Sequence, residues 1–168
     1  MRKLKLLGVA AVLGAVAAGP IAWAAEDTFD ACEVFTQAEA EKALGAPAAA
    51  PAEPVNPKTK LPPKRAKVIP ICTYSGFKES KPVSARAEFH FGKTEGDAQK
   101  AFDDARMLHQ TKPLLITGAD SAFWSGKTGQ LYVRKGRTLL TLQVGPAPVN
   151  ERDMNDARKL GEVLAKKL

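Results

Sequence analysis

The sequence predicts an α+β domain in which about five antiparallel strands form one sheet and the helices lie on one face of it. Three observations support this fold class. Short segments that alternate apolar and polar residues follow one another with brief turns between them, as in antiparallel sheets. Three other segments carry apolar residues at helical spacing. The predicted order is α-β-β-α-β-β-β-α, without the regular strand–helix alternation of a parallel sheet.

The first 24 residues predict a secretory signal peptide. A basic start (RKLK) precedes a stretch rich in Ala, Leu, Val and Gly, and AWA at 22–24 has the small-x-small pattern of a cleavage site. A permanent membrane anchor is the alternative, since about 20 residues from Leu6 are apolar enough to span a bilayer. We favour cleavage before Ala25, because Pro20 interrupts the stretch and acidic residues follow at once. We expect the mature chain, 25–168, to be one domain, periplasmic or secreted.

The charge and the cysteines of the mature chain follow from this cleavage. The net charge of +7 falls to +4, because the leader contains three basic residues and no acidic ones. The two cysteines, Cys32 and Cys72, both lie in the exported part, where an even count predicts one disulfide. Two buried free thiols are the alternative. There is no CxxC pair, and Cys32 lies past the expected cut rather than at it, so we expect neither redox activity nor a lipid anchor.

The N-terminal third of the mature chain combines a short helix with a long loop. Thr36 and Glu39 have the spacing of a capping box and predict a helix over 37–44 that ends at Gly45. Residues 46–67 contain six prolines and no aromatic residue, which predicts a long Pro-rich loop. The second half of this loop is basic and has no acid between its cations, which are Lys58, Lys60, Lys64, Arg65 and Lys67.

The remaining elements follow in order along the chain. Alternation predicts strands over 71–77 and 83–91, and Thr94 is placed to cap a helix over 95–109. Three short strands are expected near 121–125, 130–135 and 138–144, with glycines at their turns. The last element is a helix over 151–167, with Asn150 placed to cap it.

Several motifs in this order resemble a loose group of small secreted bacterial domains. They are FTQAEAEKALGAP after the first cysteine, CTYSG at the second, and then GADSAFW and LYVRKGRTLLTLQV. Many members of the group are actinobacterial lipoproteins of unknown function, and others are periplasmic proteins of Gram-negative bacteria. The resemblance implies a small α+β sandwich in which Cys32 pairs with Cys72. This chain departs from the lipoproteins because it has no lipidation cysteine, and the group implies no catalytic role.

We find no residues arranged for catalysis, metal binding or cofactor binding. The two histidines, His90 and His109, are expected on the surface, and Glu88 with His90 would supply two metal ligands, which do not make a closed site. Asp120-Ser121 fits an Asx turn better than a nucleophile, because the G-x-S-x-G elbow is absent. We therefore expect a protein that is not an enzyme and has no cofactor.

The pair Phe123-Trp124 raises the question of a binding surface. Neighbours on a strand point to opposite faces, so with helices on one face one ring should be exposed or cover the open side of the sheet. Trp124 then makes a candidate binding surface with Tyr132 and Arg134, which share a face of their strand. The interpretation we favour is that Trp124 instead covers the edge of the hydrophobic core or packs on the Pro-rich loop, since tryptophan is seldom fully buried in any case.

These features predict an exported, non-enzymatic envelope protein that binds a protein partner or an anionic envelope component. The functional interpretation of the basic segment Lys58–Lys67 is contact with anionic material such as a membrane surface. For the segment taken alone we favour a solvated linker, because charge runs usually have that role. Nucleic acid is not expected as a partner, because the chain is exported and no aromatic residues lie among the lysines. A carrier that holds a small apolar ligand between sheet and helices is the alternative function.

Overall fold

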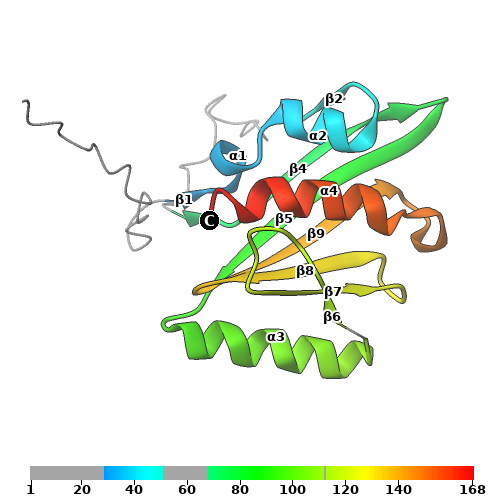
Figure 1. Cartoon of the computed structure of the whole chain (residues 1–168). Coiled ribbons are helices and arrows are strands. Elements are labelled where there is room, and N and C mark those ends of the chain that lie inside the picture. The colour runs from blue at the N-terminus through cyan, green and yellow to red at the C-terminus, as the bar shows by residue number, and fades with distance from the viewer. Residues whose placement is uncertain (1–28, 51–67, 112) are drawn as a thin grey trace, which may run out of the picture.

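A seven-stranded antiparallel sheet, in the order β2-β4-β5-β9-β8-β7-β6, forms the centre of the fold (Figure 1). The computed structural model describes residues 29–50, 68–111 and 113–168. The expected leader and the basic segment Lys58–Lys67 lie outside these described residues. The strands of the sheet are β2 (Ala48–Ala49), β4 (Ile71–Lys78), β5 (Lys81–Phe91), β6 (Pro113–Leu114), β7 (Ser121–Ser125), β8 (Gln130–Lys135) and β9 (Thr138–Pro146).

The other elements are helices and a second, small sheet. Two parallel strands of two residues each, β1 (Phe29–Asp30) and β3 (Val68–Ile69), pair beside the main sheet. The helices are α1 (Ala31–Val34), α2 (Gln37–Leu44), α3 (Glu95–His109) and α4 (Met154–Ala165), with a 3-10 turn, η1 (Val149–Glu151), before α4.

The predicted α+β class is confirmed, but the predicted strand number is too low. The five expected strands correspond to β4, β5, β7, β8 and β9, and the longer elements follow the predicted order. The edge strands β2 and β6 bring the sheet to seven. Each has only two residues, and alternation cannot identify a strand that short.

The prediction that all helices lie on one face is wrong. Helices α2 and α4 pack on one face of the sheet, and α3 packs on the other (Figure 1). Phe102 of α3 contacts Phe123 edge-on, with ring centroids 5.2 Å apart, and packs with Leu139. The sequence contains a signal for this second layer. Apolar side chains point both ways from β7 and β9, as expected of strands that are covered on both faces.

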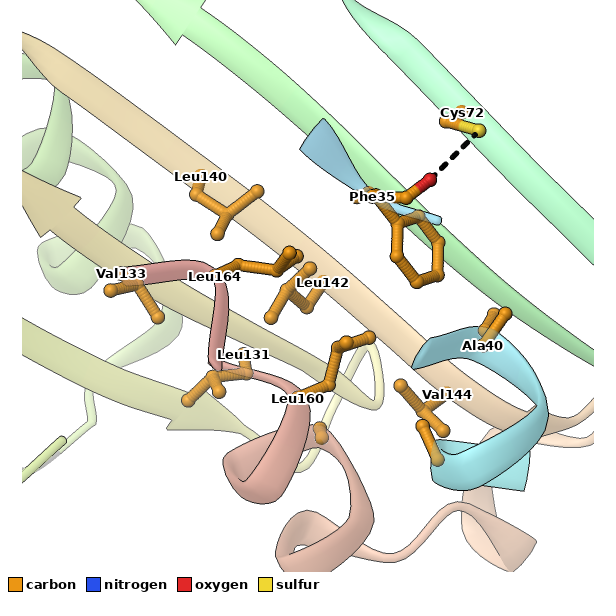
Figure 2. Packing of buried hydrophobic residues seen from close by; sticks show 14 of the residues in the cluster. Phe35, Ala40, Cys72, Leu131, Val133, Leu140, Leu142, Val144, Leu160 and Leu164 are labelled. Carbon is orange, nitrogen blue, oxygen red and sulfur yellow. Dashed lines mark hydrogen bonds between the residues drawn. The ribbon is translucent and has the colours of Figure 1, made fainter. Parts of the chain in front are cut away.

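The main core lies between the sheet and α4. Leu131 of β8, Leu140 and Leu142 of β9 and Leu164 of α4 are fully buried in it (Figure 2). Gly161 lets α4 approach the sheet closely, because a Cβ atom there would lie 2.8 Å from the Leu131 side chain. The tight packing fixes α4 against β8 and β9.

The helix caps predicted from the sequence are present at two of the three predicted helices. Thr36 with Glu39 forms the predicted capping box of α2, and Thr94 forms one with Asp97 at α3. The last helix starts later than predicted, at Met154, and its cap is Asp153 rather than Asn150. Asn150 lies in η1 instead, where the chain makes an extra turn after β9.

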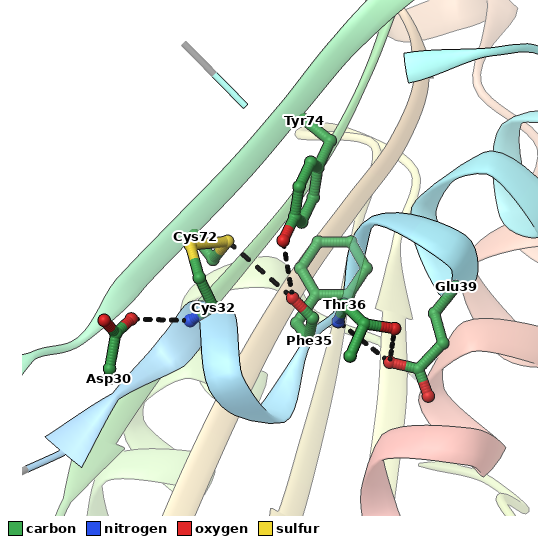
Figure 3. The surroundings of a disulfide bond; sticks show 7 residues. All are labelled: Asp30, Cys32, Phe35, Thr36, Glu39, Cys72 and Tyr74. Carbon is green, nitrogen blue, oxygen red and sulfur yellow. Dashed lines mark hydrogen bonds between the residues drawn. A yellow bond between two sulfur atoms is a disulfide. The ribbon is translucent and has the colours of Figure 1, made fainter. Parts of the chain in front are cut away.

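The predicted disulfide between Cys32 and Cys72 is present and joins the N-terminal helices to β4 (Figure 3). Beside it, the Tyr74 hydroxyl donates a hydrogen bond of 3.1 Å to the Phe35 carbonyl, and the two rings meet edge-on. The Asp30 carboxylate accepts a hydrogen bond from the Cys32 amide and caps α1. Covalent and noncovalent contacts thus fix α1 to the sheet at the same place.

Candidate binding surfaces

The two aromatic rings at 123–124 lie on opposite faces of the sheet, as their positions on one strand require. Phe123 is fully buried beneath α3, and Trp124 is partly buried against the main core on the α4 side. The expectation that one ring faces an open side of the sheet is therefore wrong for Phe123, because α3 covers that part of the face. For Trp124 the structure shows a ring at the edge of the core, not one that projects from the surface.

Tyr132 is the centre of a polar cluster at the C-terminal end of α3. Its ring stacks on Phe123, with centroids 4.5 Å apart and planes at 11°. Its hydroxyl donates to Gln130 Oε1 at 2.9 Å and lies 3.2 Å from His109 Nε2. Burial raises the pKa of Tyr132, and the nearby Glu88 charge raises it further. The hydroxyl is thus neutral, and its polar contacts are with other side chains of the protein, Gln130 and His109.

The position of His109 beside Tyr132 differs from the prediction. We predicted His109 on the surface, but it is partly buried and its ring packs 5.4 Å from that of Tyr132. Its Nδ1 atom is buried without a hydrogen-bond partner. Sequence spacing carries no signal for this contact, because the residues are 23 positions apart and meet only when α3 packs on the sheet.

Arg134 forms an ion pair and hydrogen bonds with other groups of the protein. Its guanidinium lies 3.2 Å from Asp120 Oδ2, and it donates to the Ser121 hydroxyl and the Gly136 carbonyl at 3.3 Å each. Its side chain is only 14% exposed. The same Asp120 accepts from the Gly136 amide at 2.7 Å. Tyr132 and Arg134 do share a strand face, but the structure gives each of them separate partners and places Trp124 on the opposite face.

A polar surface remains where α3 does not cover β4 and β5. There Arg86 pairs with Glu88 at 2.8 Å, and Glu88 also lies 3.2 Å from His90. Among the described residues, no group of three or more His, Cys, Asp or Glu side chains is placed to hold a metal ion. The Glu88–His90 pair therefore has no third ligand of these types in the part of the chain that is described.

A shallow hollow of about 210 Å³ lies where α2 and α4 meet the β4–β5 hairpin. Leu44, Val83 and Val144 supply apolar lining, and charged side chains surround it. Two of these, Lys81 and Glu151, pair at 3.6 Å. The hollow is smaller than the pockets of several hundred cubic ångströms that usually enclose a ligand.

The exposed apolar side chains are spread unevenly over the described residues. Leu115 is 88% exposed, Leu108 75%, Phe77 70% and Met107 66%. Three of these four lie at the C-terminal end of α3 or directly after β6. Of the helices in the described part of the chain, none has the length and apolar character needed to cross a membrane.

The basic residues Lys58, Lys60, Lys64, Arg65 and Lys67 fall outside the described residues, between β2 and β3 in the sequence. Within the described residues, Lys and Arg nearly balance Asp and Glu. The excess positive charge of the chain therefore belongs mainly to the expected leader and to this segment.

No protein-family model, curated protein or solved structure matches this chain. The resemblance to small secreted bacterial domains stays a prediction. The fold and the geometry of its surfaces are the basis for a functional proposal.

Proposed function

We propose that this is an exported, non-enzymatic protein of the bacterial envelope, and that it binds an anionic envelope component through the basic segment Lys58–Lys67, with or without a protein partner. One observation carries the proposal: the positive charge is concentrated in this segment, whereas the charges of the described residues nearly balance. A segment with five cations and no acid attracts anionic surfaces at the ionic strength of the envelope.

Many cations among the described residues have partners within the protein. Arg134 pairs with Asp120, Arg86 with Glu88, and Lys100 with Asp104. Arg152 donates to three backbone carbonyls, those of Pro146, Ala147 and Thr128, at 2.9–3.0 Å. These side chains stabilise the fold, so they leave the basic segment as the stronger candidate for an external anion.

The proposal predicts salt-sensitive binding that depends on the position of the charges. Protein purified after export, with its N terminus determined by mass spectrometry, is sedimented with isolated cell envelopes at low and high salt. In the test variant Lys58, Lys60, Lys64, Arg65 and Lys67 are all changed to Gln. The matched control makes the same charge change on five exposed lysines among the described residues, Lys42, Lys78, Lys93, Lys127 and Lys166.

The test variant should lose binding at low salt, and the control should keep most of it, because only the segment concentrates its charges. Equal losses in both variants would contradict a dedicated segment and indicate a general charge effect. If the wild type does not bind at any salt, the proposal fails. The carrier alternative would then come first, and native mass spectrometry would look for a ligand that copurifies at the hollow lined by Leu44, Val83 and Val144.

A further inference from the structure

Three large apolar side chains are exposed at one end of the molecule. Met107 and Leu108 lie in the last turn of α3, and Leu115 follows β6; they are 66%, 75% and 88% exposed. We call these three residues the α3-end patch. Single exposed leucines are common, but three such side chains within nine residues leave a concentration of apolar surface in water.

The topology brings both parts of the α3-end patch to the same edge of the sheet. His109, at the end of α3, packs with ring centroids 6.2 Å from Phe123 of β7, and β6 pairs with the same strand through Pro113 and Phe123. Figure 1 shows the end of α3 next to β6 at this edge. Leu115 follows β6 directly, so it and the end of α3 flank one corner of the molecule.

Around this corner the carboxylates of the described residues are paired, so they do not repel an anionic surface. The sequence from Ala105 to Ala119 contains no Asp or Glu. The carboxylates at either end of this stretch are paired: Asp104 with Lys100 at 2.7 Å, and Asp120 with Arg134 at 3.2 Å. One turn from the patch, Asp103 pairs with Arg106 at 3.2 Å. The nearby acids are therefore neutralised within the protein.

We infer that the α3-end patch inserts into the surface of an anionic lipid bilayer. Side chains such as Leu and Met gain free energy when they enter the boundary between headgroups and acyl chains. The other acids of α3, Glu95 and Asp97, lie in its first turn, so the helix would approach the bilayer with its C-terminal end. This inference rests on the proposed function only in that the protein must reach an envelope membrane.

The first test places a fluorescent reporter in the patch. Leu108→Trp and Leu115→Trp are made separately in the exported protein and mixed with vesicles of equal parts phosphatidylglycerol and phosphatidylcholine, with and without brominated acyl chains. The introduced indoles should shift to shorter emission wavelengths and be quenched by the brominated lipid. The native Trp124, which packs against the core, supplies the baseline. If the vesicles bind the protein but quench the introduced indoles no more than Trp124, the inference is overturned.

The second test removes the apolar surface without removing charge. The test variant combines Met107→Gln, Leu108→Gln and Leu115→Gln; glutamine keeps a helix propensity close to those of Leu and Met. The matched control combines Val68→Gln, Phe77→Gln and Val163→Gln, which are exposed apolar residues elsewhere. Unfolding midpoints confirm that both variants fold.

Vesicle affinity should fall about tenfold or more in the test variant and stay within about twofold in the control. Affinities that fall equally in both variants, or in neither, would overturn the inference. Concentration-dependent self-association that the test variant alone abolishes would also overturn it and assign the α3-end patch to a contact between copies.

The two proposals can fail separately. Binding through the basic segment decreases with salt, whereas the contribution of the α3-end patch should persist at high salt because it is apolar. Leu115→Trp is also combined with the five-Gln segment variant. If the indole at position 115 still enters the bilayer there, the lipid inference stands and the proposed role of the segment fails. If only the segment variant loses binding, the proposed function stands and the lipid inference fails.

Discussion

At the scale of single residues, Glu39 connects the capping of α2 with the C-terminal end of the chain. One carboxylate oxygen accepts hydrogen bonds of 3.0 Å from the amide and the hydroxyl of Thr36, and the other lies 2.7 Å from Lys167 Nζ. The same lysine donates to the Val34 carbonyl at 2.7 Å. Burial opposes ionisation of Glu39, but the bonds from Lys167 and Thr36 outweigh it and lower the pKa of this carboxyl below its ordinary 4.5.

This lowered pKa predicts a dependence of stability on pH. Above pH 4.5 the ionised Glu39 contributes its full stabilisation, and the contribution disappears as the pH falls through the lowered pKa of the folded state. Glu39→Gln should reduce the free energy of unfolding by about 0.5 kcal/mol at pH 7, because glutamine can still cap the helix and only the ion pair is lost. The gap between variant and wild type should narrow towards pH 3, measured as urea midpoints.

A double-mutant cycle supplies the control. Lys167→Gln removes the same ion pair, so the double variant should lose less than the sum of the two single losses. Additive losses would show that the two side chains act independently and would contradict the assignment of the pH dependence to this pair.

At the scale of elements, the β4–β5 hairpin is built on an unfavourable turn. Its two turn residues, Glu79 and Ser80, have φ values of 51° and 66°. Two-residue hairpins with positive φ at both positions strongly favour Asn-Gly. Lys78 and Lys81 also face each other across the turn, and like charges in register weaken strand pairing.

Replacement of Glu79-Ser80 by Asn-Gly should therefore stabilise the domain, by about 1 kcal/mol, through relief of backbone strain. Thermal unfolding of the variant would measure the gain. Gly136→Ala is the matched reverse change in the β8–β9 hairpin: φ is 53° and a Cβ atom would contact nothing within 4 Å, so the strain alone should destabilise the domain by about 1 kcal/mol. A neutral result at both turns would show that these hairpins relax to other turn geometries.

The elements that the sequence predicted best are those whose signal is local. The alternating β5 and the capped α2 and α3 were predicted within a few residues, because periodicity and capping are properties of short segments. The face on which α3 packs could not be deduced that way. It depends on pairs such as Phe102 and Phe123, which are distant in sequence. The start of α4 was missed because Asn150 and Asp153 are both good caps and only the path after β9 selects Asp153.

At the scale of the whole molecule, the contacts of the candidate binding residues could likewise be predicted only where they depend on local sequence pattern. Alternation correctly placed Tyr132 and Arg134 on one face of β8. It could not show that Asp120 pairs with Arg134 or that His109 lies against Tyr132, since these contacts form when separate elements pack. The surfaces left for external partners are therefore those whose side chains have few internal contacts, such as the α3-end patch.

The stability of the whole fold should depend on the disulfide, because it joins the N-terminal helices to the main sheet across 40 residues of sequence. Loop-closure entropy predicts that replacement of both cysteines by alanine lowers the free energy of unfolding by about 4 kcal/mol. Urea unfolding of Cys32→Ala/Cys72→Ala would measure the loss, and wild type unfolded under a reducing agent should give the same midpoint as the variant.

A loss below about 1 kcal/mol would contradict the entropic account, whose scale is several kcal/mol for a loop of this length. The entropic account also assumes that α1 and α2 hold their place in the unlinked protein through noncovalent contacts. The contacts available for this are the Tyr74–Phe35 hydrogen bond, the edge-on packing of the two rings, and the Glu39–Lys167 ion pair. Tyr74→Phe in the cysteine-free background tests this assumption. It should destabilise that background by about 1 kcal/mol if the contacts persist there, and leave it unchanged if α1 and α2 have detached.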